Sequence, residues 1–433
     1  MTTVTRYSPT APANRLLAPD RGVHDWYRFV LAFPPHLVRA YLSRFAVTAG
    51  QCVLDPFCGT GTTLVECRKA GVASVGIDAN PMAHFAGRVK TDWRPAGAEL
   101  LAHARMVAAA ATADLARDGL EDTPGTSGDP GIPLRELSAD ATALLLKGSI
   151  SPLPLHKTLL LLDSLGRHSD SRYTDHERLA LARAVVSGAS NLRFGPEVGV
   201  GIPKRDAPVI GLWLSAVQAM SEDLVTLQEQ GNRSGAAQAL YGDSRTLVAT
   251  LPPQSVDAVI TSPPYPNEKD YTRATRLESV LLGFINNRSE LRTLKQGLLR
   301  SNTRNVYKGD TDDQWIAAFP QIEQLATEIE ARRIALGKTS GFERLYSTVT
   351  RLYFGGMARH LAALRPALRP GAHLAYVVGD QASYFRIPIR TGQLLGAIAQ
   401  SLGYELIGID LFRTRQATAG DPLREEVVVL RWP

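Results

Sequence analysis

The chain of 433 residues has little cysteine and little lysine, and it lacks a long apolar segment. Its three cysteines form no Cys-x-x-Cys pair and have no histidine cluster beside them, which argues against a zinc site or a disulfide scaffold. No apolar run reaches the roughly 18 residues that a membrane-spanning helix needs. The first residues lack the apolar centre of a signal peptide. We therefore expect a cytoplasmic protein with no membrane partner.

Lysine supplies only nine of the 48 basic side chains, so arginine supplies the rest, and the formal net charge is +6. Arginine suits bidentate contacts to phosphate and guanine, although a GC-rich genome produces the same bias. The composition therefore permits a nucleic-acid partner without establishing one. The length exceeds that of one minimal domain, and 44% of the residues are hydrophobic, as in ordinary globular proteins.

Short apolar segments alternate with longer helical ones, which predicts an α/β fold. Helix is expected over 22–46, with an interruption at 33–35, and over 62–70. A loop is expected at 194–208 and an exposed linker at 121–133. The last two strands are candidates for an antiparallel pair at one edge of the sheet. The predicted strands lie at 52–54, 74–77, 239–241, 256–260, 373–378, 404–412 and 426–431.

The order of these segments predicts one catalytic domain with inserted elements. Residues 52–78 run strand, glycine-rich loop, helix and strand, which is the opening of a doubly wound, Rossmann-like sheet. The strand pattern resumes only near residue 239. We predict a catalytic domain formed by 1–90 and 236–433, and a helical insertion at 91–235 that is a candidate for target recognition. A second helical and basic insertion is expected at 285–345.

The glycine-rich turn after the first strand has the sequence Asp-Pro-Phe-Cys-Gly-Thr-Gly-Thr-Thr, from Asp55 to Thr63. A phosphate-binding loop of the Walker type would need a Gly-Lys pair, and the turn contains no lysine. A nicotinamide dinucleotide site prefers a third Gly or Ala where this chain has Leu64. The remaining interpretation is a methyl-donor site, in which the turn contacts the methionine part of the cofactor.

Two acidic residues follow later strands at the same predicted edge. Asp78 ends the second strand and can accept hydrogen bonds from both hydroxyls of a ribose. Asp243 follows the third strand, where it either bonds the amino group of the cofactor's adenine or caps a helix.

A second motif, Ser262-Pro263-Pro264-Tyr265, ends the strand at 256–260. The two prolines stop the strand and leave carbonyl oxygens free. An exocyclic amine of cytosine or adenine is a poor nucleophile, and acceptors aimed at its N–H groups favour the tetrahedral form. The Ser262 hydroxyl and the Pro263 carbonyl are candidates for this role. The Tyr265 ring offers a face on which a base flipped out of the duplex can stack.

Together these motifs resemble the DNA amino-methyltransferase family, over residues 20–90, 237–275 and roughly 350–433. The resemblance implies a seven-stranded sheet with an antiparallel last strand, S-adenosyl-L-methionine as cofactor and double-stranded DNA as partner. A cognate restriction endonuclease is a further candidate partner. Ser at the first catalytic position resembles the N4-cytosine subgroup, with N6-adenine as the alternative. The implied catalytic residues are Ser262, Pro263, Pro264 and Tyr265, and the cofactor-binding ones are Phe33, Pro34, Asp55, Pro56, Phe57, Cys58, Gly59, Gly61, Thr62, Asp78 and Asp243.

The chain departs from many relatives because its cofactor motif precedes its catalytic motif, which leaves the place of the target-recognition region open. Methylation at carbon 5 of cytosine is disfavoured, since it needs a nucleophilic Cys and none follows Cys67. Other open alternatives are an RNA base amino-methyltransferase, a non-catalytic nucleic-acid-binding protein and, more remotely, a nicotinamide dehydrogenase.

Basic loops supply the candidate contacts to nucleic acid, although solvated or ion-paired helix faces give the same pattern. One loop spans residues 191–205, one follows the catalytic motif at 266–273, and one lies at 288–308. The predicted contact residues are Arg193, Lys204, Arg205, Lys269, Tyr271, Arg273, Arg300 and Arg304.

Overall fold

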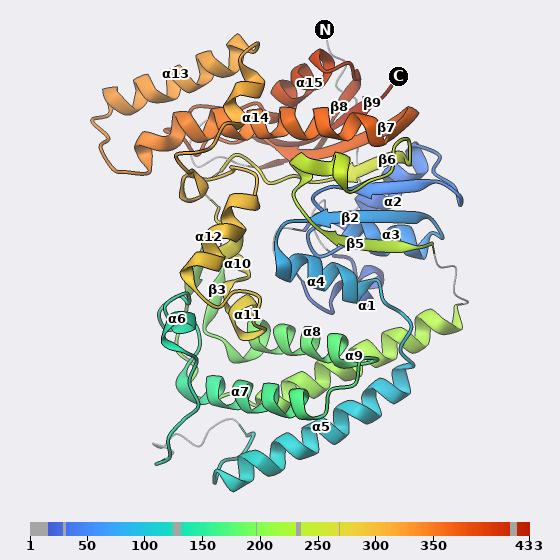
Figure 1. Cartoon of the computed structure of the whole chain (residues 1–433), viewed down its shortest axis with the longest axis vertical. Helices are drawn as coiled ribbons and strands as arrows, with labels where there is room; N and C mark the ends of the chain where they lie inside the picture. The colour runs from blue at the N-terminus through green and yellow to red at the C-terminus, as the bar shows by residue number, and fades with distance from the viewer. Residues whose placement is uncertain are drawn as a thin grey trace.

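A seven-stranded sheet forms the centre of the computed structural model, which describes residues 16–28, 32–123, 131–195, 197–230, 235–267, 269–415 and 422–433 (Figure 1). The strand order is β5-β2-β1-β6-β7-β9-β8. Part of the predicted linker, residues 124–130, lies outside the described residues. The strands are β1 (Cys52–Asp55), β2 (Ala73–Asp78), β5 (Ala237–Tyr241), β6 (Val256–Thr261), β7 (Leu368–Gly379), β8 (Glu405–Arg415) and β9 (Leu423–Arg431).

The pairing of the strands confirms the predicted α/β, Rossmann-like sheet. β1 pairs in parallel with β2 and β6, β2 with β5, and β6 with β7. β9 runs antiparallel to both β7 and β8, which confirms the predicted antiparallel pair at one edge. β2 and β5 are neighbours although residues 79–236 separate them in sequence, so one sheet is assembled from both sides of the insertion.

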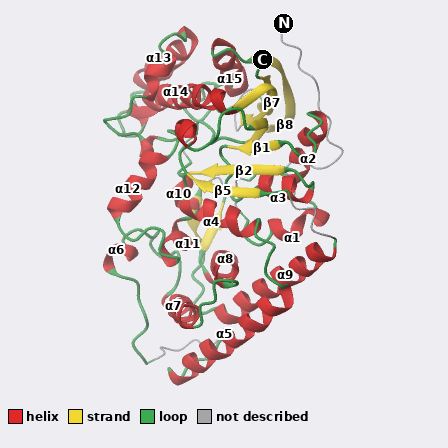
Figure 2. Cartoon of the chain, turned by 45° about the vertical axis from the view of Figure 1, so that its right-hand side comes forward, coloured by secondary structure: helices red, strands yellow, loops and turns green. Residues whose placement is uncertain are grey.

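Side chains alternate between the two faces of the sheet, as the two-residue period of a strand requires. Leu54 and Val259 pack in a core with α14, whereas Val53 and Ile260 pack in a second core with α2. Figure 2 shows helices on both sides of the strands. The helices of these two layers are α2 (Pro35–Arg44) and α3 (Thr62–Lys69) on one side, and α13 (Pro320–Ala335), α14 (Tyr346–Leu364) and α15 (Thr391–Ser401) on the other.

The segment between α4 and β5 folds into a helical layer below the sheet in Figure 1. Its core is shared with Trp26, which follows α1, and with Phe85 of α4, both of which lie in one cluster with Trp213, so the layer packs directly on the sheet domain. The helices of this region are α1 (Arg21–His24), α4 (Pro81–Lys90), α5 (Gly97–Arg117), α6 (Ala139–Thr142), α7 (Pro152–Arg167), α8 (Thr174–Ala184) and α9 (Val209–Glu229).

Two predictions of local structure are wrong in part. The helix expected over 22–46 is two helices, because α1 ends at His24 and α2 begins only at Pro35, whose fixed φ suits a first turn. The loop expected at 194–208 is partly a hairpin. β3 (Leu192–Phe194) pairs antiparallel with β4 (Val198–Val200), since alternating apolar residues and glycines allow a tight pair there.

The segment between β6 and β7 carries short helices and then α13 and α14. The short helices lie beside β3 and α6 at the left of Figure 1. In the described part of the chain no helix is long and apolar enough to cross a membrane. The short helices are α10 (Tyr271–Ala274), α11 (Arg276–Leu281) and α12 (Arg288–Gly297).

Candidate active site

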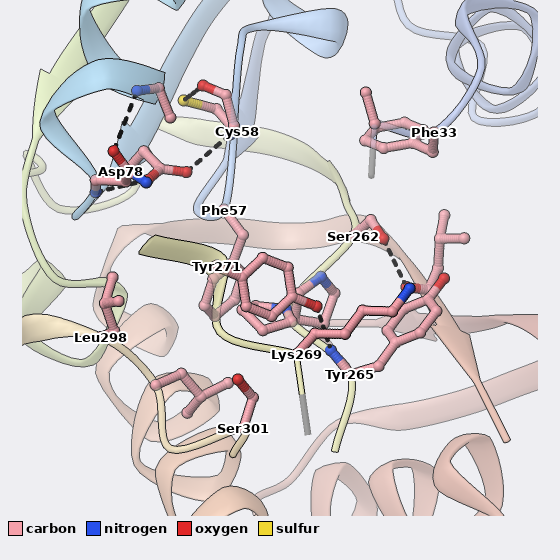
Figure 3. A pocket seen from close by; sticks show the side chains of 18 of the residues that line it. Phe33, Phe57, Cys58, Asp78, Ser262, Tyr265, Lys269, Tyr271, Leu298 and Ser301 are labelled. Atoms are coloured by element: carbon pink, nitrogen blue, oxygen red, sulfur yellow. Dashed lines mark hydrogen bonds between the residues drawn. The ribbon is translucent and has the colours of Figure 1, made fainter. Parts of the chain in front are cut away.

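A cavity of about 520 Å³ opens where β1, β2, β5 and β6 end, within the size range of small-molecule sites. Open parallel sheets bind ligands at this edge. The cavity brings together most of the predicted site residues (Figure 3). Those that line it are Phe33, Pro56, Phe57, Cys58, Gly59, Thr62, Asp78, Asp243, Ser262, Pro263, Pro264, Tyr265, Lys269 and Tyr271. Pro34, Asp55 and Gly61 lie behind this wall or beside it.

The glycine-rich turn has a backbone that only glycine adopts easily. Gly59 has φ +51° and Gly61 has φ +85°. A Cβ on Gly61 would lie 3.0 Å from the Cα of Gly87 in α4, whereas a Cβ on Gly59 would meet nothing within 4 Å. Gly61 therefore serves the packing of α3 against α4, and Gly59 leaves the cavity wall open beside a ligand.

Asp55 supports the turn from below, because its side chain is fully buried and does not line the cavity. Its carboxylate accepts hydrogen bonds from the hydroxyls of Thr63 and Thr261, each at 2.6 Å, and from the Phe57 amide at 3.2 Å. Burial raises the pKa of Asp55 to about 6. Asp55 thus joins the ends of β1 and β6 to the start of α3, and any effect on the cofactor is indirect.

Asp78 lines the cavity at the end of β2, as predicted for a ribose contact. Its two carboxylate oxygens accept the backbone N–H groups of Gly59 and Asn80, both at 2.8 Å. Burial raises the pKa of Asp78 to about 6. Each oxygen keeps a further lone pair for a ligand hydroxyl.

Asp243 caps the 3₁₀ helix Ser244–Ala249, as one interpretation predicts, and it also lines the cavity, where the adenine contact stays a prediction. Its carboxylate accepts the Arg245 amide at 2.9 Å and forms an ion pair with the Arg245 guanidinium at 2.7 Å. Arg245 also binds Asp312, which ties this edge of the cavity to the segment after β6.

The catalytic motif has its acceptors turned toward the cavity. The Ser262 hydroxyl donates to the Val377 carbonyl at 3.1 Å and also interacts with the Tyr265 phenol, which leaves one of its lone pairs for an incoming N–H group. In the described part of the chain the Pro263 carbonyl accepts no hydrogen bond. The Tyr265 amide donates to the Tyr271 hydroxyl at 3.1 Å, which fixes the loop after the strand.

The Tyr265 ring lies against the backbone of β7. A Cβ built on Gly379 would come within 2.8 Å of the Tyr265 Cε2 atom. Burial raises the pKa of the Tyr265 phenol well above its usual value, so the ring stays neutral at physiological pH. Gly379 is therefore a positioning residue for Tyr265, which the sequence motif did not reveal.

Both inserted segments contribute residues to the cavity that the sequence did not predict. Glu197, at the turn of the β3–β4 hairpin, comes from the first segment, and Ser301 and Asn305 come from the second. Asn305 is 1% exposed, and neither polar atom of its side-chain amide has a partner among the described residues. Buried amides are almost always bonded, so this one is available to a ligand. Asn305 carries no motif, and only its position marks it.

The residues predicted to contact nucleic acid fall into four groups. Lys269 and Tyr271 line the cavity, and Arg193, Lys204, Arg205 and Arg304 are exposed around it or on the hairpin. Arg273 is half-buried. Arg300 is 4% exposed, binds Asp310 at 2.7 Å and donates to the Gln296 carbonyl. Its guanidinium holds the loop together, and its burial does not fit a phosphate contact.

The sheet order, the reversed β9 and a glycine turn facing an acidic strand end define the class of methyltransferases with a Rossmann-like fold. A family model described as DNA methylase matches residues 20–85. Type II methyltransferase M.BsoBI of Geobacillus stearothermophilus is 25% identical over 429 residues, covering 93% of this chain and 83% of that protein.

Two further relatives agree. Type II methyltransferase M.AvaI of Nostoc is 22% identical over 418 residues, covering 88% of this chain and 79% of that protein. Type II methyltransferase M.MjaII of Methanocaldococcus jannaschii is 40% identical over 70 residues, 16% of this chain and 13% of that protein. Over most of its length the chain is therefore similar to Type II methyltransferases, which supports the DNA amino-methyltransferase family, and its cofactor is S-adenosylmethionine.

The cavity fits this cofactor. The wall at Gly59 is open, so a ligand can approach the protein backbone there. The free lone pairs of Asp78 suit the ribose hydroxyls, and the apolar side chains of Phe33 and Phe57 suit the apolar parts of the cofactor. Among the described residues no group of three or more His, Cys, Asp or Glu side chains is placed to hold a metal ion.

Proposed function

We propose that the chain methylates the exocyclic N4 amine of cytosine in double-stranded DNA. The observation that carries the proposal is the state of Ser262, whose only hydroxyl proton is used by the Val377 carbonyl. The hydroxyl oxygen and the Pro263 carbonyl are then two acceptors at one strand end, matched to the two N–H groups of a free amine. Ser at this position also resembles the N4-cytosine subgroup.

S-adenosylmethionine supplies an electrophilic methyl group when it is bound. The chain's part in the reaction is to hold the amine so that its lone pair faces that group, which positioning and fixed dipoles accomplish. Tyr265 stacks on the base, and its backbone is fixed by Tyr271. The amine held by the Ser262 hydroxyl and the Pro263 carbonyl would receive this methyl group. The nitrogen then becomes acidic and releases a proton to water, so no strong base is needed.

The surroundings of the cavity support duplex DNA as the substrate. Arg193, Lys204 and Arg205 lie on or beside the hairpin whose turn reaches the cavity at Glu197, and Arg304 lies on the second inserted segment. Cations flanking a site that takes up a flipped base suit the phosphates on either side of it. We therefore propose target recognition by the segment 91–235, with 285–345 as the opposite wall. The M.BsoBI and M.AvaI relatives, both Type II methyltransferases, support this substrate.

The test is expression in a methylation-free host, followed by sequencing and by mass spectrometry of the digested nucleosides. We expect N4-methylcytosine at one sequence motif. The Tyr265→Ala variant, which should still bind cofactor, serves as the inactive control. If only N6-methyladenine were found, adenine would be the methylated base and the assignment to cytosine would be wrong. If the purified chain methylated RNA but not DNA, the assignment of DNA as the substrate would be wrong.

A further inference from the structure

A small side pocket adjoins the cavity on the side of α1 and α2. It has a volume of about 40 Å³ and shares Ala32, Phe33, Thr60 and Thr62 with the main cavity. Figure 3 shows Phe33 well away from Asp78, so the side pocket and the ribose contact lie apart. A space of this size holds a group of two or three heavy atoms, such as a carboxylate, but no ring.

Lys90, the last residue of α4, lines this side pocket and is 2% exposed. Its ammonium group donates to the His24 carbonyl at 3.2 Å and to the Thr60 hydroxyl at 3.4 Å. In the described part of the chain no carboxylate lies within 4 Å of its Nζ atom. The acidic group whose charge acts on it, Asp25, lies farther off and pairs with Arg21.

A buried cation without a counter-ion is costly, and proteins almost always pair it. Burial lowers the pKa of Lys90 to about 7, which is the usual response of a lysine held in this way. Other buried cations of this chain have their partners. The Lys157 ammonium lies 2.7 Å from Asp206, and the Arg245 guanidinium lies 2.7 Å from Asp243. Lys90 therefore has no anionic partner among the described residues, and a bound ligand can supply one.

S-adenosylmethionine carries one anionic group, the carboxylate of its methionine part. We propose that Lys90, with Thr60 beside it and Arg28 at the mouth of the side pocket, binds this carboxylate. The methionine end of the cofactor then points toward α1, and Asp78 and Asp243 receive the ribose and the adenine. Lys90 thus sets the direction of the cofactor in the cavity. The inference does not depend on which base is methylated.

The experiment is calorimetric titration of the full chain with S-adenosylmethionine and with its decarboxylated analogue, which keeps the sulfonium, the amine and the nucleoside. The wild-type chain should bind the complete cofactor about 10- to 100-fold more tightly, as expected for a hydrogen-bonded ion pair. Lys90→Met should remove this preference, with the affinity for the analogue unchanged to within about twofold. Retained binding of the analogue also shows that the variant is folded.

The matched control is Lys69→Met. Lys69 lies on the neighbouring α3, but it has a carboxylate partner in Glu66 at 3.1 Å and is absent from the side pocket. This control should keep the preference for the complete cofactor. Lys90→Gln is a second neutral variant, because its amide can still donate to the His24 carbonyl if the Met variant does not fold.

Three results would overturn the inference. They are equal affinities of the wild-type chain for both compounds, an equal loss of both affinities in the neutral variants, and an unchanged preference in these variants. A chain that shows the expected preference but methylates no DNA would contradict the proposed function and leave this inference in place.

Discussion

Replacing Gly379 by alanine should slow methyl transfer without disturbing cofactor binding. The new Cβ would lie 2.8 Å from Cε2 and 3.1 Å from Cδ2 of the Tyr265 ring, whereas ordinary contact begins near 3.4 Å. The ring must therefore retreat by about 0.6 Å, and a misplacement of about 1 Å in an active site can cost 100-fold in rate. We expect kcat to fall about 10- to 100-fold. Gly379 ends β7, and its carbonyl accepts the Thr391 hydroxyl at 2.9 Å, so the backbone itself cannot move away easily.

The assay is single-turnover methyl transfer to a duplex that contains the mapped motif, with calorimetric binding of S-adenosylmethionine in parallel. Gly166→Ala in α7 is the matched control, because a Cβ there meets nothing within 4 Å and the position is helical. We expect the control to keep the wild-type rate, with a stability equal to or slightly above wild type. A Gly379→Ala variant that transfers methyl groups at the wild-type rate would refute the role given to the Tyr265 ring. Parallel losses of kcat and cofactor affinity would point to general distortion instead.

Three further predictions concern charged side chains. Burial raises the pKa of Asp55 from 3.8 to about 6, so the folded protein holds the proton of this carboxyl more tightly than the unfolded chain does. The ionised carboxylate therefore lowers the free energy of unfolding. This effect is absent below pH 3.8 and complete above pH 6, where it amounts to at most about 3 kcal/mol. Urea unfolding at pH 5 and 7.5 should therefore show a smaller loss of stability with rising pH in Asp55→Asn than in wild type; equal losses would contradict this. Asp78→Asn should weaken S-adenosylmethionine binding about 10-fold or more, measured by calorimetry, since one acceptor oxygen is lost; an unchanged affinity would exclude the ribose contact. Arg304→Ala should weaken DNA binding and lower its salt dependence by about one counter-ion, measured by gel shift. Arg300→Ala should chiefly lower the melting temperature, because it leaves Asp310 without its ion-pair partner. The reverse pattern in the two experiments would contradict these assignments.

The strand ends could be predicted from the sequence because short-range patterns determine them. A glycine turn after β1, an acidic residue after β2 and two prolines after β6 each report a local backbone need, and parallel strands bring their carboxyl ends to one edge. The roles of Arg300 and Lys90 could not be predicted in the same way. Whether a charged side chain is buried, and which partner it binds, depends on segments far apart in sequence. A run of basic residues has the same sequence pattern whether its side chains are exposed to solvent or buried in ion pairs.

The same limit explains the walls of the cavity. Glu197 and Asn305 lie in segments without a recognisable motif, and they reach the cavity only because both insertions fold back against the sheet edge. Asp55 illustrates the opposite error, because its place in a known motif suggested a direct cofactor contact. In the structure the Asp55 carboxylate instead accepts hydrogen bonds from the Thr63 and Thr261 hydroxyls.

The pairing of β2 with β5 has a consequence for how the protein is made. Ser74 through Asp78 lie beside residues 237–241, so the edge that carries Asp78 stays unpaired while the ribosome adds the intervening helices. During that interval the nascent chain holds an open, apolar strand edge, which is a hazard for association with other chains. The helical layer against α1 and α4 can form first, and we expect it to shield the first half of the sheet until β5 and β6 emerge.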